Sequence, residues 1–363
     1  MDKVCSKINY VMKIETSYLT TQKALFEWCQ RNDSQKLVAI DTEFERRRTF
    51  FPILCLVQLA TEESICCIDT VAIKVLEPLI TFLNDSRRTL VFHAARQDLE
   101  VLIPSGLKPT ATIFDTQLAA SFCGFRDQIG YADLVFELLE TKIDKSSQKT
   151  NWLKRPLSDT QLAYAAEDVK YLFSMSDILK NNLISLNRLN WVLEECRLMS
   201  LLVFDDSPYD SWKRLKNINS LPMNLAQKAC EVAVWREQLA RKVNAPRNWI
   251  LSDKNIKDLV TTSIESKTEL FLVFEQSEYL RSNDINNLYE ILTGKKSNAN
   301  ISYSRPPKLS DQQKETIIKA IEKIQDVAKN NDLEPGLLAT TRELKHLISY
   351  KTSDRLLARW RKQ

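Results

Sequence analysis

The sequence predicts an α/β domain with a mixed sheet, followed by a C-terminal half made of helices. Residues 7–70 have the apolar alternation of strands with one helix between them, and helices and strands then alternate to about residue 103. Beyond that point helical spacing dominates. An order of strands, then alternation, then helices is typical of an α/β domain with a mixed sheet. The chain of 363 residues is long enough for two or three domains.

The first elements follow from the spacing of the apolar residues. Thr20–Arg31 has helical spacing, with Thr20 or Thr21 as the N-cap. Leu37–Ile40 is an apolar run that ends in Asp-Thr-Glu, as expected of a buried strand that presents polar side chains at its C-terminal end. Ile53–Ala60 and Ser64–Ile68 are expected to form strands around a turn at 61–63.

The remainder of this domain becomes progressively helical. We expect one strand at Thr89–Phe92 and helices around 71–83, 94–103, 115–122, 130–141, 158–187 and 191–204. The first domain is therefore predicted to span residues 1–205.

The C-terminal half is predicted to contain two helical modules, at 212–295 and 306–363. Asp205–Asp210 is a predicted linker, and Lys295–Leu309 is a second one, because it is polar, basic and contains two prolines. Residues 211–363 hold 27 Lys+Arg and 18 Asp+Glu, a charge of +9, whereas the rest of the chain carries −5. An acidic half joined to a basic half favours a carboxylate site served by a module that binds a polyanion.

Composition excludes several classes of protein. The longest apolar stretch, Phe50–Ala60, is much shorter than the ~20 residues of a membrane span, and no secretory leader is recognisable, so no membrane partner is expected. Two histidines exclude a multi-histidine zinc site, and none of the five glycines forms a phosphate-binding loop, so no nucleotide cofactor is expected. Eight scattered cysteines without a CxxC pair predict reduced thiols and a cytoplasmic protein.

Four acidic residues and one tyrosine stand out by their context. Asp41 and Glu43 are two residues apart at a strand end, so their side chains project to the same face. Asp98 lies near the start of a helix after a strand, where a solvated helix-face charge is the alternative. Asp168 is four residues after Tyr164, which places both on one helical face, although Glu167 competes with Asp168 as the functional acid.

This set predicts chemistry based on oxygen ligands. Hard divalent cations such as Mg²⁺ or Mn²⁺ prefer carboxylates and water, and phosphodiester cleavage by two such ions requires a carboxylate cluster of this kind. Tyr164 would orient the attacking water rather than deprotonate it, because an ordinary tyrosine pKa near 10 is unsuited to a base at neutral pH.

Several motifs resemble those of a known family. AIDTEF (39–44), FHAARQDLEVL (92–102) and YAAEDVKYL (164–172) are similar to the three motifs of 3′→5′ exonucleases with four acidic residues and a tyrosine. FDTQLAASFCGF (114–125) and NWLKRPLSDTQLAYAAEDV (151–169) resemble ribonuclease D specifically. The resemblance implies a ribonuclease H-like fold, two divalent metal ions bound by Asp41, Glu43, Asp98 and Asp168, and a 5′-nucleoside monophosphate product. It also implies RNA substrates, tRNA precursors especially.

The C-terminal half resembles a pair of HRDC domains, the helical domains shared by ribonuclease D and some helicases. KACEVAVWREQLARKVNAPRNWILSD (228–253) is similar to the first HRDC domain, and LEPGLLATTRELKHLI (333–348) to the second. In relatives, such modules bind nucleic acid or partner proteins.

Four further residues are candidate substrate contacts: Thr42, Phe44, His93 and Arg155. Phe44 can stack on the terminal base or serve as a buried strand aromatic, and His93 can lie near the metals or be a satisfied strand-end histidine. Arg155 is also expected to hold the loop before the last catalytic helix.

Two other functions remain compatible with the residues. A DNA 3′→5′ exonuclease would use the same carboxylates, because no residue visibly recognises the 2′-hydroxyl. A non-catalytic RNA-binding protein is the second, and retention of all four acids and the tyrosine disfavours it. The oligomeric state is left open.

Overall fold

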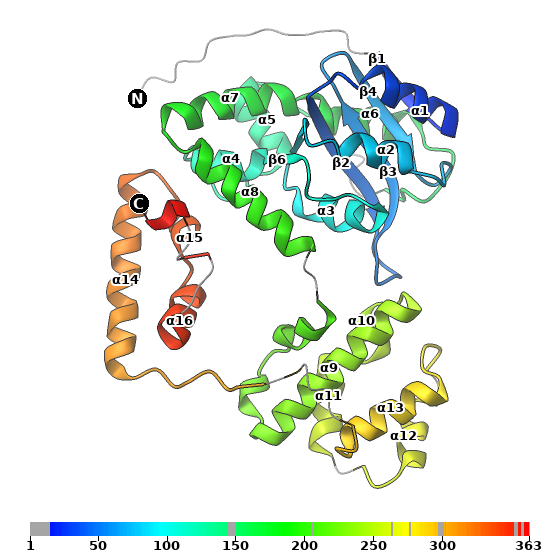
Figure 1. Ribbon diagram of the computed structural model, residues 1–363, viewed down its shortest axis with the longest axis vertical. Helices are drawn as coiled ribbons and strands as arrows, with labels where there is room; N and C mark the ends of the chain where they lie inside the picture. Colours follow the sequence, from blue (N-terminus) through cyan, green and yellow to red (C-terminus); the bar gives the residue numbers. More distant parts are fainter. Residues whose placement is uncertain are drawn as a thin grey trace. The chain divides into compact units, whose positions relative to one another are not determined.

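A computed structural model describes residues 15–143, 150–204, 207–262, 264–275, 277–296, 301, 303–351, 355–356 and 359–362. The chain divides into two compact units, and Figure 1 labels their helices and strands. Unit 1 comprises residues 1–44 and 54–197, and unit 2 comprises residues 45–53 and 198–363. Residues 7–14 of the predicted strand region and Asp205 and Asp206 of the predicted linker lie outside the described residues.

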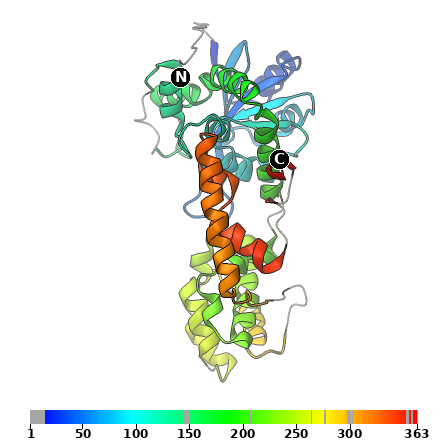
Figure 2. The same cartoon turned by 90° about the vertical axis from the view of Figure 1, so that its left-hand side faces the viewer.

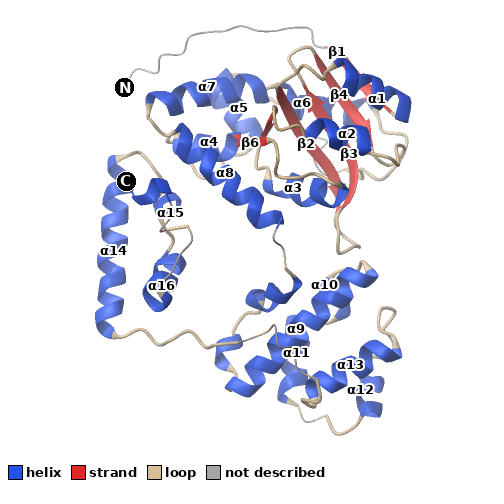
Figure 3. Ribbon diagram, in the orientation of Figure 1, coloured by secondary structure: helices blue, strands red, loops and turns tan. Residues whose placement is uncertain are grey.

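Unit 1 is built on a six-stranded mixed sheet, in the order β1-β4-β3-β2-β5-β6 (Figure 3). β1 runs parallel to β4, and β2 and β6 run parallel to β5, whereas β3 is antiparallel to β4. The predicted fold class is therefore confirmed. The strands are β1 Glu15–Leu19, β2 Leu37–Glu45, β3 Ile53–Ala60, β4 Ser64–Asp69, β5 Thr89–Phe92 and β6 Thr112–Asp115.

Helices cover both faces of this sheet. Neighbouring strand residues point to opposite faces, and on β4 Cys66 lies near Cys29 of one helix, whereas Cys67 lies near Asp168 of another. The helices that contain residues of unit 1 are α1 Gln22–Arg31, α2 Glu77–Leu83, α3 Arg96–Leu102, α4 Thr116–Phe122, α5 Tyr131–Leu139, α6 Asp159–Lys170, α7 Leu172–Ser185 and α8 Leu189–Phe204.

Local signals placed most of these elements correctly, with four differences. Strand β2 continues to Glu45, so Asp41 and Glu43 lie within the strand and not beyond its end. Helix α2 starts at Glu77 and not near residue 71, because Pro78 is tolerated only in a first helical turn. The strand β6 was not predicted, and the predicted helix 158–187 is two helices that meet at Tyr171.

Apart from the segment 45–53, the regular elements in the described part of unit 2 are helices. Helix α9 Met223–Val243 is central, and its Glu237, only 1% exposed, binds Arg241 and Arg247. α14 Asp311–Asn330 packs with α15 Pro335–Leu338 and α16 Thr341–Tyr350 (Figure 2). The other α-helices are α10 Arg247–Ile250, α11 Asp253–Thr261, α12 Lys267–Val273 and α13 Ser282–Leu292, with 3₁₀ turns at 208–214, 218–220 and 359–362. The module boundaries at 212–295 and 306–363 stay a prediction.

The loop between β2 and β3 belongs to unit 2 by its packing. The guanidinium groups of Arg241 and Arg247 lie 5.2 and 4.5 Å from the centre of the Phe50 ring. The Phe51 N–H donates to the Asn244 side-chain oxygen at 3.0 Å. Residues 45–53, which start two residues after Glu43, are thus anchored on α9, the turn after it and the start of α10.

None of the helices in the described ranges is both long enough and apolar enough to cross a membrane.

Candidate metal centre

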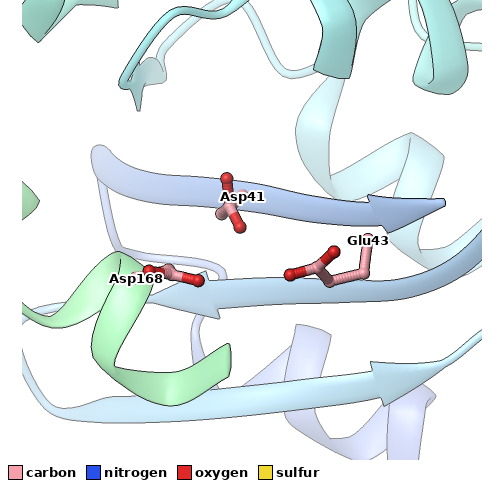
Figure 4. A group of neighbouring side chains, drawn as sticks. All are labelled: Asp41, Glu43 and Asp168. Carbon is pink, nitrogen blue, oxygen red and sulfur yellow. The ribbon is translucent and has the colours of Figure 1, made fainter. Parts of the chain in front are cut away.

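Three of the predicted carboxylates converge at one place. Asp41 and Glu43 come from β2 and Asp168 comes from α6, and one oxygen of each lies within 4.8 Å of the others (Figure 4). Among the described residues this is the one group of three such side chains with metal-ligand spacing. Strand alternation puts Asp41 and Glu43 on the same face, and α6 crosses that face because it packs against β4.

A local signal fixes where α6 begins. The Ser158 hydroxyl accepts from the Gln161 N–H at 3.2 Å, and the Gln161 side chain accepts from the Ser158 N–H at 3.0 Å. This reciprocal pair is a capping box, and its sequence signal is a serine followed three residues later by a glutamine. It sets the start of the helix, so Tyr164 and Asp168 are placed one turn apart along it.

The centre is electrostatically unfavourable without a cation. Burial, followed by the charges of the neighbouring acids, raises the pKa of Glu43 to about 9 and that of Asp168 to about 9. Burial raises the pKa of Asp41 to about 7. Without a cation, Glu43 and Asp168 hold protons at neutral pH and Asp41 is about half protonated, and hard divalent cations are the partners that would let all three ionise together. The donor set therefore fits Mg²⁺ or Mn²⁺.

Asp98 lies beside this group and not within it. Its side chain is buried, and the Thr42 hydroxyl donates to one of its oxygens at 2.6 Å. Burial, followed by the charge of Asp41, raises the pKa of Asp98 well above its usual range. The alternative of a solvated helix-face charge is wrong, because Asp98 faces inward next to Asp41. Since the Thr42 hydroxyl is engaged by Asp98, a substrate contact of Thr42 stays a prediction.

Tyr164 lies next to the third carboxylate. A hydrogen bond joins its hydroxyl to Asp168. Burial, followed by the charges of Asp168, Glu43 and Asp41, raises the pKa of Tyr164 far above its usual value. The phenol is therefore protonated in the metal-free centre, which fits a group that orients water and disfavours a general base.

The other candidate contacts have partners inside the protein. Both ring nitrogens of His93 are engaged, Nδ1 with the Thr116 hydroxyl at 2.9 Å and Nε2 with the Ile129 carbonyl at 3.0 Å. Phe44 is partly buried in β2. Arg155 binds Asp69 through two nitrogens, at 2.6 and 2.7 Å. Contacts of these three residues with substrate stay predictions.

Sequence reasoning missed one residue that organises the site. Asp115 caps α4, accepting from Gln117 N–H at 2.8 Å, and it also accepts from the N–H groups of Ala94 and Ala95 at 3.1 and 2.9 Å. It thereby fixes the turn that leads into α3 and Asp98. An Asp directly before a helical run is an N-cap signal in the sequence, but the bonds to Ala94 and Ala95 have no local signature.

Comparisons with known proteins agree with this geometry. A 3′-5′ exonuclease family model matches residues 16–184. Ribonuclease D of Jannaschia sp. (strain CCS1) is 40% identical over 259 residues, which cover 69% of this chain and 67% of the relative. Ribonuclease D of Desulfotalea psychrophila is 34% identical over 339 residues, which cover 90% of each chain. The chain belongs to the ribonuclease D family. It is therefore an enzyme, a 3′-5′ exoribonuclease.

A solved structure supports the same assignment over almost the whole chain. The crystal structure of Escherichia coli RNase D, described as an exoribonuclease involved in structured RNA processing, superimposes with a TM-score of 0.83 at 27% identity. The match covers 97% of this chain and 96% of that one. Some curated family members are matched less completely, since this chain spans 63% of ribonuclease D from Gluconacetobacter diazotrophicus.

Proposed function

We propose that the chain removes nucleotides one at a time from the 3′ end of RNA and releases 5′-nucleoside monophosphates, using two divalent ions. The observation that carries this proposal is the convergence of Asp41, Glu43 and Asp168, with ligand oxygens within 4.8 Å of one another. Asp98, buried beside Asp41, is the fourth proposed ligand. Mg²⁺ or Mn²⁺ bound there would lower the pKa of the attacking water and offset the negative charge that develops on the phosphate.

The protein's own groups have distinct tasks in this proposal. The four carboxylates would hold the ions, Asp98 from a buried position and Asp41, Glu43 and Asp168 from partly exposed ones. The Tyr164 hydroxyl, hydrogen-bonded to Asp168, would accept or donate a hydrogen bond to the attacking water and fix its direction. Thr42 would act through Asp98, whose orientation its hydroxyl fixes.

We also propose that the basic C-terminal half supplies affinity for long RNA, tRNA precursors especially. Residues 211–363 carry +9, whereas the rest of the chain carries −5, which on its own repels a polyanion. Two divalent ions would offset that repulsion only near the terminal phosphates. A cytoplasmic location is proposed as well, because all seven cysteines in the described ranges are free thiols.

One assay tests the reaction and separates the alternatives. The purified full chain is stripped of metal and given end-labelled RNA and DNA of equal sequence, with Mg²⁺, with Mn²⁺ and with excess EDTA. We expect stepwise shortening of RNA from the 3′ end, dependence on added metal and release of 5′-monophosphates. Equal degradation of DNA would favour a DNA exonuclease, and activity in EDTA would remove the two-metal proposal. Binding of RNA without shortening in any condition would favour a non-catalytic protein.

A further inference from the structure

Helices α6 and α7 follow each other with a one-residue interruption, and no helix-breaking residue lies at it. Helix α6 ends at Lys170 and α7 starts at Leu172, with Tyr171 as the turn between them. Proline, glycine or an inserted group usually causes such an interruption. Residues 167–175 contain neither proline nor glycine. The cause therefore lies elsewhere in the fold.

The hydroxyl of Tyr131, from the first position of α5, lies at this interruption. It donates to the Glu167 carbonyl at 2.7 Å and accepts from the Tyr171 N–H at 3.3 Å. In an unbroken α-helix that N–H would donate to the carbonyl four residues earlier, which is the carbonyl of Glu167. A phenol can donate and accept at once. The Tyr131 hydroxyl thus stands between the two groups that would otherwise bond to each other.

Tyr131 is itself held in place from the opposite side. The Ile129 carbonyl, two residues before it, accepts from His93 Nε2 at 3.0 Å and from Gln117 Nε2 at 3.0 Å. The rings of His93 and Tyr131 meet edge to face, with centres 5.7 Å apart. His93 directly follows β5, so the position of Tyr131 is tied to the sheet.

We propose that Tyr131 is a positioning residue for the metal centre, because its hydroxyl ends α6 and sets the rotation of that helix's last turn. In that rotation Asp168, and not Glu167, meets Asp41 and Glu43. Tyr131 acts through Asp168 and touches no substrate in this scheme. His93 contributes by holding Tyr131, which gives this histidine a task without any contact to metal or RNA. The inference rests on the proposed two-metal function.

Tyr131→Phe tests the proposal, because it removes only the hydroxyl. The Glu167 carbonyl and the Tyr171 N–H can then bond directly, and the last turn of α6 shifts Asp168. We expect Mn²⁺ affinity, measured by calorimetry without RNA, to fall by roughly 10- to 100-fold, as is usual for groups that orient metal ligands. The kcat on a short RNA oligonucleotide should fall similarly with KM unchanged. Wild-type Mn²⁺ affinity and kcat in this variant would overturn the proposal.

A matched control separates positioning from simple loss of a buried hydroxyl. Ser176→Ala, in α7, also removes one hydroxyl bonded to a carbonyl, that of Phe173 at 2.9 Å, but leaves the interruption untouched. It should retain wild-type metal affinity and kcat. An equal loss in both variants would mean that general destabilisation of α7 explains the effect, and the positioning role would fail.

A measurement on the unmodified chain keeps the proposal testable if Tyr131→Phe does not fold. Mn²⁺ should slow amide hydrogen exchange in a peptide that covers 165–172 more than in one that covers 175–183. Equal slowing would count against coupling between the interruption and the metal centre. Failure of the wild-type chain to bind Mn²⁺ or cleave RNA would instead refute the proposed function, and this inference with it.

Discussion

Replacing Arg155 by Met removes a cation that is expected to hold unit 1 together. The guanidinium binds both oxygens of Asp69, at 2.6 and 2.7 Å, and donates to the carbonyls of Cys55 at 2.8 Å and Trp152 at 2.6 Å. Asp69 is only 1% exposed. Removing Arg155 therefore leaves a buried carboxylate without its cation and frees the segment that precedes α6.

The expected loss follows from the pKa of Asp69. Burial alone would raise that pKa, but hydrogen bonds from Arg155 and Tyr18 overcome the effect and lower it from 3.8 to about 2. At 1.36 kcal/mol per pH unit the difference is worth about 2 kcal/mol. Breaking a buried pair by removing one partner typically costs roughly 3–5 kcal/mol. Asp69 keeps its hydrogen bonds from the N–H groups of Val71 and Ala72. We therefore expect Arg155→Met to lower the unfolding free energy at pH 7 by about 3 kcal/mol, the lower end of this range.

The pH dependence has a definite sign. The pKa of Asp69 is lower in the folded state, so its stabilisation is complete above pH 3.8 and is lost as the pH falls through 2. The difference in unfolding free energy between wild type and Arg155→Met should therefore narrow by about 1 kcal/mol from pH 5 to pH 3.

Urea unfolding followed by tryptophan fluorescence at pH 7, 5 and 3 measures this. Arg96→Met is the control, because the Arg96–Glu100 pair is exposed and should contribute less than about 1 kcal/mol. The reasoning would be refuted if Arg155→Met lowered the unfolding free energy by less than about 1 kcal/mol at pH 7. It would also be refuted if the difference between wild type and variant did not narrow from pH 5 to pH 3. If Arg155 contacts RNA as well, KM for a short oligonucleotide should rise in the folded variant; an unchanged KM would leave only the structural role.

Three further predictions concern the centre and its RNA. Asp168→Asn should abolish turnover, yet in EDTA at pH 7 it should raise the unfolding free energy by on the order of 2–4 kcal/mol, because the wild-type pKa of about 9 makes folding increasingly costly above pH 3.8. Urea unfolding of both proteins at pH 4 and pH 7 measures this difference. No gain in unfolding free energy at pH 7 would contradict the prediction. Tyr164→Phe should lower kcat less than any aspartate change, and Glu167→Gln should keep most activity; a loss in Glu167→Gln equal to that of Asp168→Asn would reverse their assignment. The double variant Lys254→Gln and Lys257→Gln, at exposed positions of α11, should weaken binding of structured RNA. The slope of log K against log salt concentration should also fall by roughly 0.7 per lost phosphate contact. Titrations at several salt concentrations measure both quantities, and an unchanged slope would exclude α11 as an RNA contact.

The sequence predicted those parts of the site that depend on short-range periodicity. Asp41 and Glu43 share a face because strand side chains alternate, and Ser158 with Gln161 announces the start of α6. The choice of Asp168 over Glu167 did not follow from spacing, since both positions share a helical face with Tyr164. The structure makes that choice by placing Asp168 with the other two acids.

The parts that were not predicted depend on residues far apart in the chain. The interruption at Tyr171 has no local cause, because the inserted hydroxyl comes from Tyr131, 40 residues earlier. The partner of Arg155 is Asp69, 86 residues away. Side-chain hydrogen bonds of this length leave no periodic trace in a sequence, so only the fold reveals them.

The packing of the loop 45–53 constrains how this chain can be recombined with its relatives. A chimaera that exchanged only residues 198–363 would bring in a foreign α9 and keep the native Phe50 and Phe51. The foreign segment would then contain counterparts of Arg241, Arg247 and the Asn244 acceptor only by chance. The transferable block is therefore discontinuous, because residues 45–53, which are the loop and one strand residue on each side of it, must travel with a segment that begins about 150 positions later.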